Sequence, residues 1–154
     1  MSNLERLPVR TVAEILKSKG HQHPVIELSD TARSAEDAAK SLGVAVGAIV
    51  KTLLFIVVTD EKQTPIVALI SGDGMCDTRA LLSLTGLKGK MTRPSANEVK
   101  SVTGFSIGGV SPIGLPSNLS IFLDTSLDNY PEIWSAAGHP HCVFKLCAKI
   151  SLKT

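Results

Sequence analysis

The sequence predicts an α+β fold in which a mixed, mostly antiparallel, twisted and partly closed β-sheet is surrounded by short helices. Residues 48–59 form an apolar run, rich in β-branched side chains, that is apolar on both alternating sides. Such a run is typical of a central strand covered on both faces. A polar turn at 60–65 and a second apolar run at 66–71 indicate an antiparallel hairpin. Short helices mixed irregularly with strands, rather than regular βαβ repeats, complete the prediction.

Two helices are expected before the central strand. The residues Thr11–Glu14 match a capping box, which predicts a helix that starts there and ends at Gly20. A second helix is expected over residues 34–43, with a buried side made mostly of alanine. Between the two helices, residues 21–28 are expected to form a strand that Pro24 interrupts early.

The elements expected after the hairpin are short. In chain order they are a helix from Asp77 to about Gly86, a strand at 88–93, a helix from the capping box Ser95–Glu98 to Gly104, a strand at 119–123, a helical turn at 126–134 and a last strand at 142–147.

The composition fits one globular domain spanning residues 1–154, with 44% hydrophobic residues and a formal net charge of +2. Only 4% of residues are aromatic, which disfavours the reading of single-stranded RNA by base stacking. Three cysteines without a CxxC pattern favour a reducing compartment. There is no apolar segment of the length that a signal peptide or membrane span needs. A cytoplasmic protein is expected, with neither a membrane nor DNA as a partner.

Two features of the sequence could carry chemistry. Lys51 is the one formal charge in the central strand, and it either extends to water or holds an ammonium group at the edge of a pocket. The loop 106–116 contains several glycines and two stiffening prolines, so its amides could cradle a carbonyl or phosphate oxygen; an ordinary connection is the alternative. A second loop, 136–140, is expected to join the 126–134 turn to the last strand.

Familiar catalytic and metal-binding motifs are absent from the sequence. It contains no G-x-S-x-G elbow, no Walker motif and no GxGxxG. The histidine pairs His21/His23 and His139/His141 lack an obvious third ligand, so solvent-facing histidines are favoured over a zinc site. We therefore expect neither a metal nor a cofactor.

Taken together, three segments resemble the YbaK/ProX family. They are the run Ile49–Phe55 around Lys51, the GxxxP loop Gly108–Pro112 and the late Ala136–Gly138, and they occur in the family's order. The family comprises stand-alone relatives of the editing (INS) domain inserted in bacterial prolyl-tRNA synthetases. The resemblance extends from about Val12 to the last strand.

The resemblance implies a trans-acting aminoacyl-tRNA deacylase, a hydrolase that cleaves the ester between a wrong amino acid and the 3′ end of a tRNA. The implied partners are the acceptor end of a mischarged tRNA and an aminoacyl-tRNA synthetase. Lys51 would be the catalytic residue. The implied substrate-binding residues are Thr52, Gly108, Gly109, Val110, Ser111, Pro112, Ala137 and Gly138. The alternative is a non-catalytic tRNA- or synthetase-associated binding module on the same fold.

The chain departs from the cysteinyl-tRNA-specific branch that it resembles. That branch has a serine followed by a basic-glycine-acid pattern near its late loop, where this chain has Ala136, His139, Pro140 and Val143. Glu27 stands where the branch carries an aromatic residue. Cysteinyl specificity is therefore not expected. Ala136, Ala137 and the glycines indicate little polar readout of the side chain, so a small aliphatic amino acid, carried on tRNA-Pro, is the expected substrate.

Overall fold

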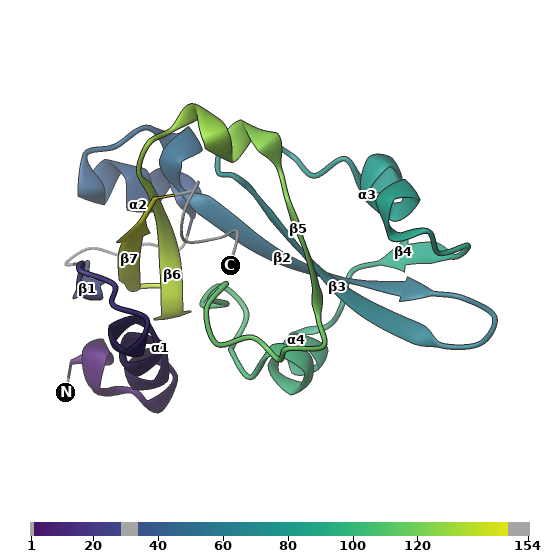
Figure 1. Cartoon of the computed structure of the whole chain (residues 1–154), viewed down its shortest axis with the longest axis horizontal. Helices are drawn as coiled ribbons and strands as arrows, with labels where there is room; N and C mark the ends of the chain where they lie inside the picture. The colour runs from purple at the N-terminus through teal and green to yellow at the C-terminus, as the bar shows by residue number, and fades with distance from the viewer. Residues whose placement is uncertain (1, 29–33, 148–154) are drawn as a thin grey trace.

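A computed structural model describes residues 2–28 and 34–147 (Figure 1). The helices are α1 (Leu7–Ser18), α2 (Ala35–Leu42), α3 (Thr78–Thr85) and α4 (Ala96–Thr103), with short 3₁₀ turns η1 (Asn3–Glu5), η2 (Val46–Ala48) and η3 (Thr125–Asn129). The strands are β1 (Ile26–Glu27), β2 (Val50–Val58), β3 (Gln63–Ser71), β4 (Lys90–Thr92), β5 (Ser120–Leu123), β6 (Ile133–His139) and β7 (Cys142–Leu146).

The strands form two open sheets, in the orders β1-β7-β6 and β4-β2-β3-β5. Pairing within them is antiparallel except between β3 and β5. In Figure 1 the long hairpin of β2 and β3 crosses the molecule, with the three-stranded sheet at one end and α3 and β4 at the other. An isolated bridge between Ile49 and Trp134 links the sheets. The predicted α+β class and the mostly antiparallel pairing are confirmed, and neither sheet closes on itself.

Strand β2 is covered on both faces, as its two-sided apolar pattern predicts. On one face Val50 and Leu54 pack into a core formed with α1, α4, β6 and β7. On the other face Phe55 and Val57 pack with β3 and with Leu81 of α3. A third cluster joins the alanines of α2 to Ile49 and Val143. The hairpin is therefore the element against which most of the fold packs.

Several helix ends follow the sequence signals. Ser34 caps α2, Asp77 caps α3, and Ser95 with Glu98 forms the capping box of α4. Gly43, Gly86 and Gly104 end these three helices in the left-handed conformation that glycine adopts most readily.

The predicted start of α1 is wrong. The helix begins at Leu7, and Pro8 occupies its first turn, where a missing N–H costs nothing. Thr11 therefore lies inside the helix, and its hydroxyl donates to the carbonyl of Leu7.

The strand predicted over residues 21–28 is also mostly wrong. Only Ile26 and Glu27 pair, with Val143 and Cys142 of β7.

The helical turn predicted at 126–134 ends early. Helix η3 stops at Asn129, and Trp134 belongs to β6, where it pairs with Lys145. The predicted loop 136–140 is likewise mostly strand, because β6 continues to His139 through a bulge after Ala136. Alanine, glycine and histidine have weak strand preference, so long-range pairing with β7 decides this segment.

Candidate active site

A free strand edge lies beside Lys51. Strand β4 pairs with β2 only at Ile56, Val57 and Val58, so residues 50–55 have no strand on that side within the described chain. The carbonyl of Ile56 accepts from the Thr92 hydroxyl at 2.9 Å, which shows that the polar groups of Ile56 face β4. Because these groups alternate along an antiparallel strand, those of Thr52 and Leu54 point in the same direction. The free edge therefore presents unpaired amides and carbonyls.

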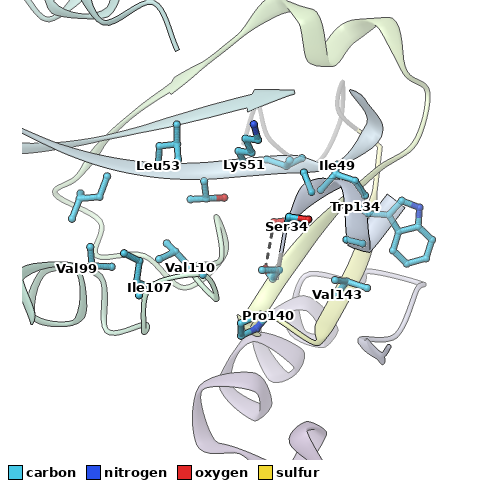
Figure 2. Close-up of a pocket in the computed structure, with 18 of the residues that line it drawn as sticks. Ser34, Ile49, Lys51, Leu53, Val99, Ile107, Val110, Trp134, Pro140 and Val143 are labelled. Carbon is cyan, nitrogen blue, oxygen red and sulfur yellow. Dashed lines mark hydrogen bonds between the residues drawn. The ribbon is translucent and has the colours of Figure 1, made fainter. Parts of the chain in front are cut away.

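A cavity of about 420 Å³ runs along this edge (Figure 2). Its walls come from β2, α2, β6, the loop after α4 and the residues that follow β4. Three charged residues, Glu36, Lys51 and Arg93, line it together with apolar side chains such as Leu53, Val110 and Trp134. The cavity thus combines an apolar interior with free backbone groups and a few charges, which is the usual composition of a small-molecule site.

Lys51 extends from the face of β2 that carries Leu53 and Phe55. Its ammonium group donates to the carbonyl of Gly74 at 3.3 Å. Figure 2 shows Lys51 on the other side of β2 from Val110 and Pro140. No carboxylate lies within ion-pair distance of Lys51 in the described part of the chain. Lys51 is half-buried and lines the cavity, while its ammonium group is held by the carbonyl of Gly74.

Thr52 points to the opposite face of β2, the one on which Val50 and Leu54 pack with Val110. Its hydroxyl is buried and has no hydrogen-bond partner. An unsatisfied buried hydroxyl is costly to the fold, so a residue of this kind at a cavity suggests a role in binding.

The glycine loop separates two environments. Gly108 and Val110 line the cavity, and Gly108 has φ +86°, which favours glycine. Ser111 is fully buried, and its hydroxyl accepts from the amide of Ile113. Pro112 lines a second cavity. Only the first half of the predicted GxxxP loop therefore faces the cavity that Lys51 lines.

Gly109 fixes the loop against β6. A Cβ atom at this position would lie 2.9 Å from both the amide nitrogen and the Cα of His139. Contacts that close to backbone are essentially never found, so only glycine allows this approach. The loop and the end of β6 consequently hold each other in place.

Ala137 and Gly138 pack against the core and helix α1 and do not line the cavity. Ala137 is fully buried in the main core, and its neighbour Ala136 lines the cavity instead. Gly138 has φ +100°, and a Cβ there would lie 2.9 Å from the backbone of Pro8 in α1. Of the predicted residues, Lys51, Thr52, Gly108 and Val110 line the cavity, whereas Gly109, Ser111, Pro112, Ala137 and Gly138 do not.

Sequence reasoning did not single out Glu36 and Arg93. Glu36 lies in the first turn of α2, and Arg93 directly follows β4. A charge next to a proline at the end of an expected strand was the available signal for Arg93, but such charges are common on surfaces.

The histidines near the end of β6 stay close together. The Nδ1 atom of His139 accepts from the amide of His141 at 3.1 Å. Burial, with help from Arg6 and His141, holds the pKa of His139 below its usual value. Burial likewise raises the pKa of the Cys142 thiol to about 11. Within residues 2–28 and 34–147, no three metal-binding side chains come together.

Comparison with known proteins gives the family. The family model for the aminoacyl-tRNA editing domain matches residues 29–149. The chain belongs to the aminoacyl-tRNA editing domain family. This agrees with the YbaK-like resemblance drawn from the residues around Lys51, the GxxxP loop and the late glycine.

Individual proteins and solved structures are similar to most of this chain. The uncharacterized protein YwhH of Bacillus subtilis is 31% identical over 128 residues, 83% of this chain and 78% of its own. EbsC of Enterococcus faecalis, a candidate Cys-tRNA(Pro)/Cys-tRNA(Cys) deacylase by its name, is 35% identical over 68% of this chain and 62% of its own. A crystal structure described as a candidate trans-editing enzyme for prolyl tRNA synthetase has a TM-score of 0.82 and 34% identity, covering 94% of this chain and 88% of that one.

Proline–tRNA ligases from several bacteria also contain a matching segment, which makes up 14–17% of each ligase. Segments similar to this chain therefore occur both in larger synthetases and in chains of about this length. None of the helices in the described segments combines the length and apolar character that crossing a membrane requires.

Proposed function

We propose that this editing-domain protein acts in trans as a deacylase that hydrolyses the ester between a small, wrongly attached amino acid and the 3′ end of a tRNA. The observation that carries the proposal is the cavity along the free edge of β2, whose lining includes Lys51, Thr52 and Gly108. The substrate would be a mischarged tRNA, with tRNA-Pro as the favoured carrier. We place this reaction in the cytoplasm, where aminoacyl-tRNA is used.

The reaction needs little from the protein beyond positioning. Water attacks the ester carbonyl, a new carbon–oxygen bond forms, and the bond to the ribose oxygen breaks. The amino acid leaves as a carboxylate, while one proton of the water passes to the ribose oxygen and the other is released to solvent. An activated ester needs a fixed carbonyl, donors for the developing oxyanion and a water in line, but no covalent nucleophile.

The cavity contains groups suited to each of these tasks. The unpaired amides at the free edge of β2 and the amide at Gly108 are donors for the carbonyl oxygen as it becomes negative. The Lys51 ammonium, held by one carbonyl at 3.3 Å, can leave that contact for the ester. The unpartnered hydroxyl of Thr52 can bind the attacking water or a substrate oxygen.

The amino-acid side chain would meet small and apolar residues. Ala35, Ala38 and Ala136 line the cavity together with Ile49 and Val143. Such a wall selects by size, and one methylene changes binding by only about 1–3 kcal/mol. We therefore expect several small amino acids to be accepted and bulky ones to be refused. Glu36, at the same cavity, is the acidic group available to the substrate's α-ammonium.

The test is single-turnover deacylation of tRNA-Pro and a second tRNA, each charged with alanine, glycine, serine, cysteine or proline. We expect hydrolysis of the smaller aminoacyl groups and much slower hydrolysis of Pro-tRNA-Pro. Activity should survive exhaustive chelation.

Tight binding of these substrates without any hydrolysis would favour the non-catalytic binding module on the same fold. Activity lost together with a stoichiometric metal would contradict the proposed mechanism.

A further inference from the structure

Two cations share one face of β2. Arg93 directly follows the last residue of β4, Thr92, which pairs with Ile56. Arg93 therefore lies beside Phe55, and its guanidinium carbon is 5.4 Å from the centre of that ring. Lys51 is on the same face of β2, four residues before Phe55. At about 3.3 Å per residue, Lys51 and Phe55 are about 13 Å apart along the strand.

Arg93 has no acidic partner in the described chain. Within residues 2–28 and 34–147, the only ion pair joins Lys145 and Glu132. Asp77 and Asp124 both accept helix-capping amide hydrogen bonds. Arg93 is exposed, and its guanidinium lies over the Phe55 ring at the wall of the cavity. The ring holds the side chain and leaves the nitrogen atoms of the guanidinium available.

The surface between the two cations is apolar. Leu53, half-buried, lies between Lys51 and Phe55 on this face and lines the same cavity. Arg93 itself is exposed, so it lies at the solvent-facing opening of the cavity. A ligand with an ester at one end and an anion at the other end would match the positions of the two cations.

We propose that Arg93 binds a backbone phosphate at the 3′ end of the tRNA while Lys51 serves the ester. This inference rests on the proposed function. A guanidinium donates two parallel hydrogen bonds to a phosphate, which an ammonium group does not. The pairing fixes the terminal ribose, and with it the ester, along the free edge of β2. Arg93 is thus a positioning residue that lets the enzyme distinguish a nucleotide ester from a simple one.

The test compares 3′-aminoacyl-adenosine with its 5′-phosphate and with an aminoacyl-CCA trinucleotide. For the wild-type protein we expect a higher kcat/KM on the phosphate-bearing substrates, mainly through a lower KM. In Arg93→Gln the ratio between phosphate-bearing and phosphate-free substrates should fall about tenfold or more. Arg93→Lys should recover only part of it. Arg10→Gln, which removes an exposed arginine of α1 outside the cavity, should leave the ratio unchanged.

The same contact can be measured without turnover, through the ratio of affinities for AMP and adenosine in each folded variant. Unchanged ratios in Arg93→Gln, in both hydrolysis and binding, would overturn the assignment of Arg93 while leaving the deacylase in place. A wild-type protein that hydrolyses none of these esters and no aminoacyl-tRNA would instead overturn the proposed function. The binding ratio would then still decide whether Arg93 recognises phosphate.

Discussion

Two cavities in the described part of the chain have similar size and different character. The first, of about 420 Å³, runs along the free edge of β2 and contains Glu36, Lys51 and Arg93. The second, of about 380 Å³, is lined by aliphatic side chains and prolines, with Lys19 as its charged member. One loop divides them, since Val110 lines the first and Pro112 the second.

The difference between the cavities lies in their charged residues. The second is bounded by β3 and β5, and β5 is an edge strand of its sheet, so a free strand edge is not peculiar to the first cavity. The first borders six residues of β2 that β4 is too short to cover. Volume alone therefore does not mark a site for polar chemistry. The first cavity is distinguished by its three charged residues around an apolar interior.

The largest expected effect is at Lys51. Lys51→Ala should lower the single-turnover deacylation rate about a hundredfold or more, the loss typical of one transition-state contact, with the fold intact by circular dichroism. Lys51→Arg should fail nearly as badly, because a planar fork does not replace a compact ammonium in a confined site. Full activity in Lys51→Arg would leave only long-range attraction for phosphates, which salt would weaken.

Gly109 tests whether the dividing loop must lie against β6. Gly109→Val places a branched side chain where even a Cβ would lie 2.9 Å from the His139 backbone. The loop must move, and a displacement of about 1 Å can cost about a hundredfold in rate.

Gly104→Ala is the control for this change, because its Cβ meets nothing within 4 Å and only the positive φ is strained. It should lower stability by about 1 kcal/mol without changing the rate. Equal rates in Gly109→Val and wild type would separate the loop from the site.

Thr52 offers a matched pair of substitutions. Both Thr52 and Thr64 carry a buried hydroxyl without a partner, but only Thr52 lines the first cavity. Replacing either residue by valine should leave the free energy of unfolding unchanged or raise it by up to about 1 kcal/mol, because an unsatisfied hydroxyl is removed. Thr52→Val should also slow deacylation about tenfold, as expected for one lost hydrogen bond. Identical kinetics in the two variants would assign the Thr52 hydroxyl no function.

The smallest effect on activity is expected in the second cavity. Leu119→Ala, at its half-buried wall, should lower the free energy of unfolding by about 1–2 kcal/mol, as loss of apolar contact does. Deacylation kinetics at a temperature where the variant is folded should match the wild type. A large drop in kcat would show that the two cavities are coupled through the loop that divides them.

Much of the local structure could be predicted from the sequence. The two-sided apolar run gave β2, its polar turn and return gave the hairpin, and capping residues such as Asp77 and Ser95 gave helix starts. These signals are short in range, because a cap or an apolar period is satisfied within a few residues of itself. Lys51 and the glycine loop were also identifiable, through their resemblance to a family.

Pairing between distant segments decided the rest. The sequence by itself determined that a strand would contain Lys51, but not that β4 would end at Thr92 and leave the edge beside Lys51 free. The local sequence predicts that Trp134 belongs to a helical turn, whereas pairing with Lys145 of β7 places it in a strand. Arg93 becomes a partner for phosphate only when register places it on Phe55. These outcomes depend on which segments far apart in the chain come together, and no local pattern encodes that choice.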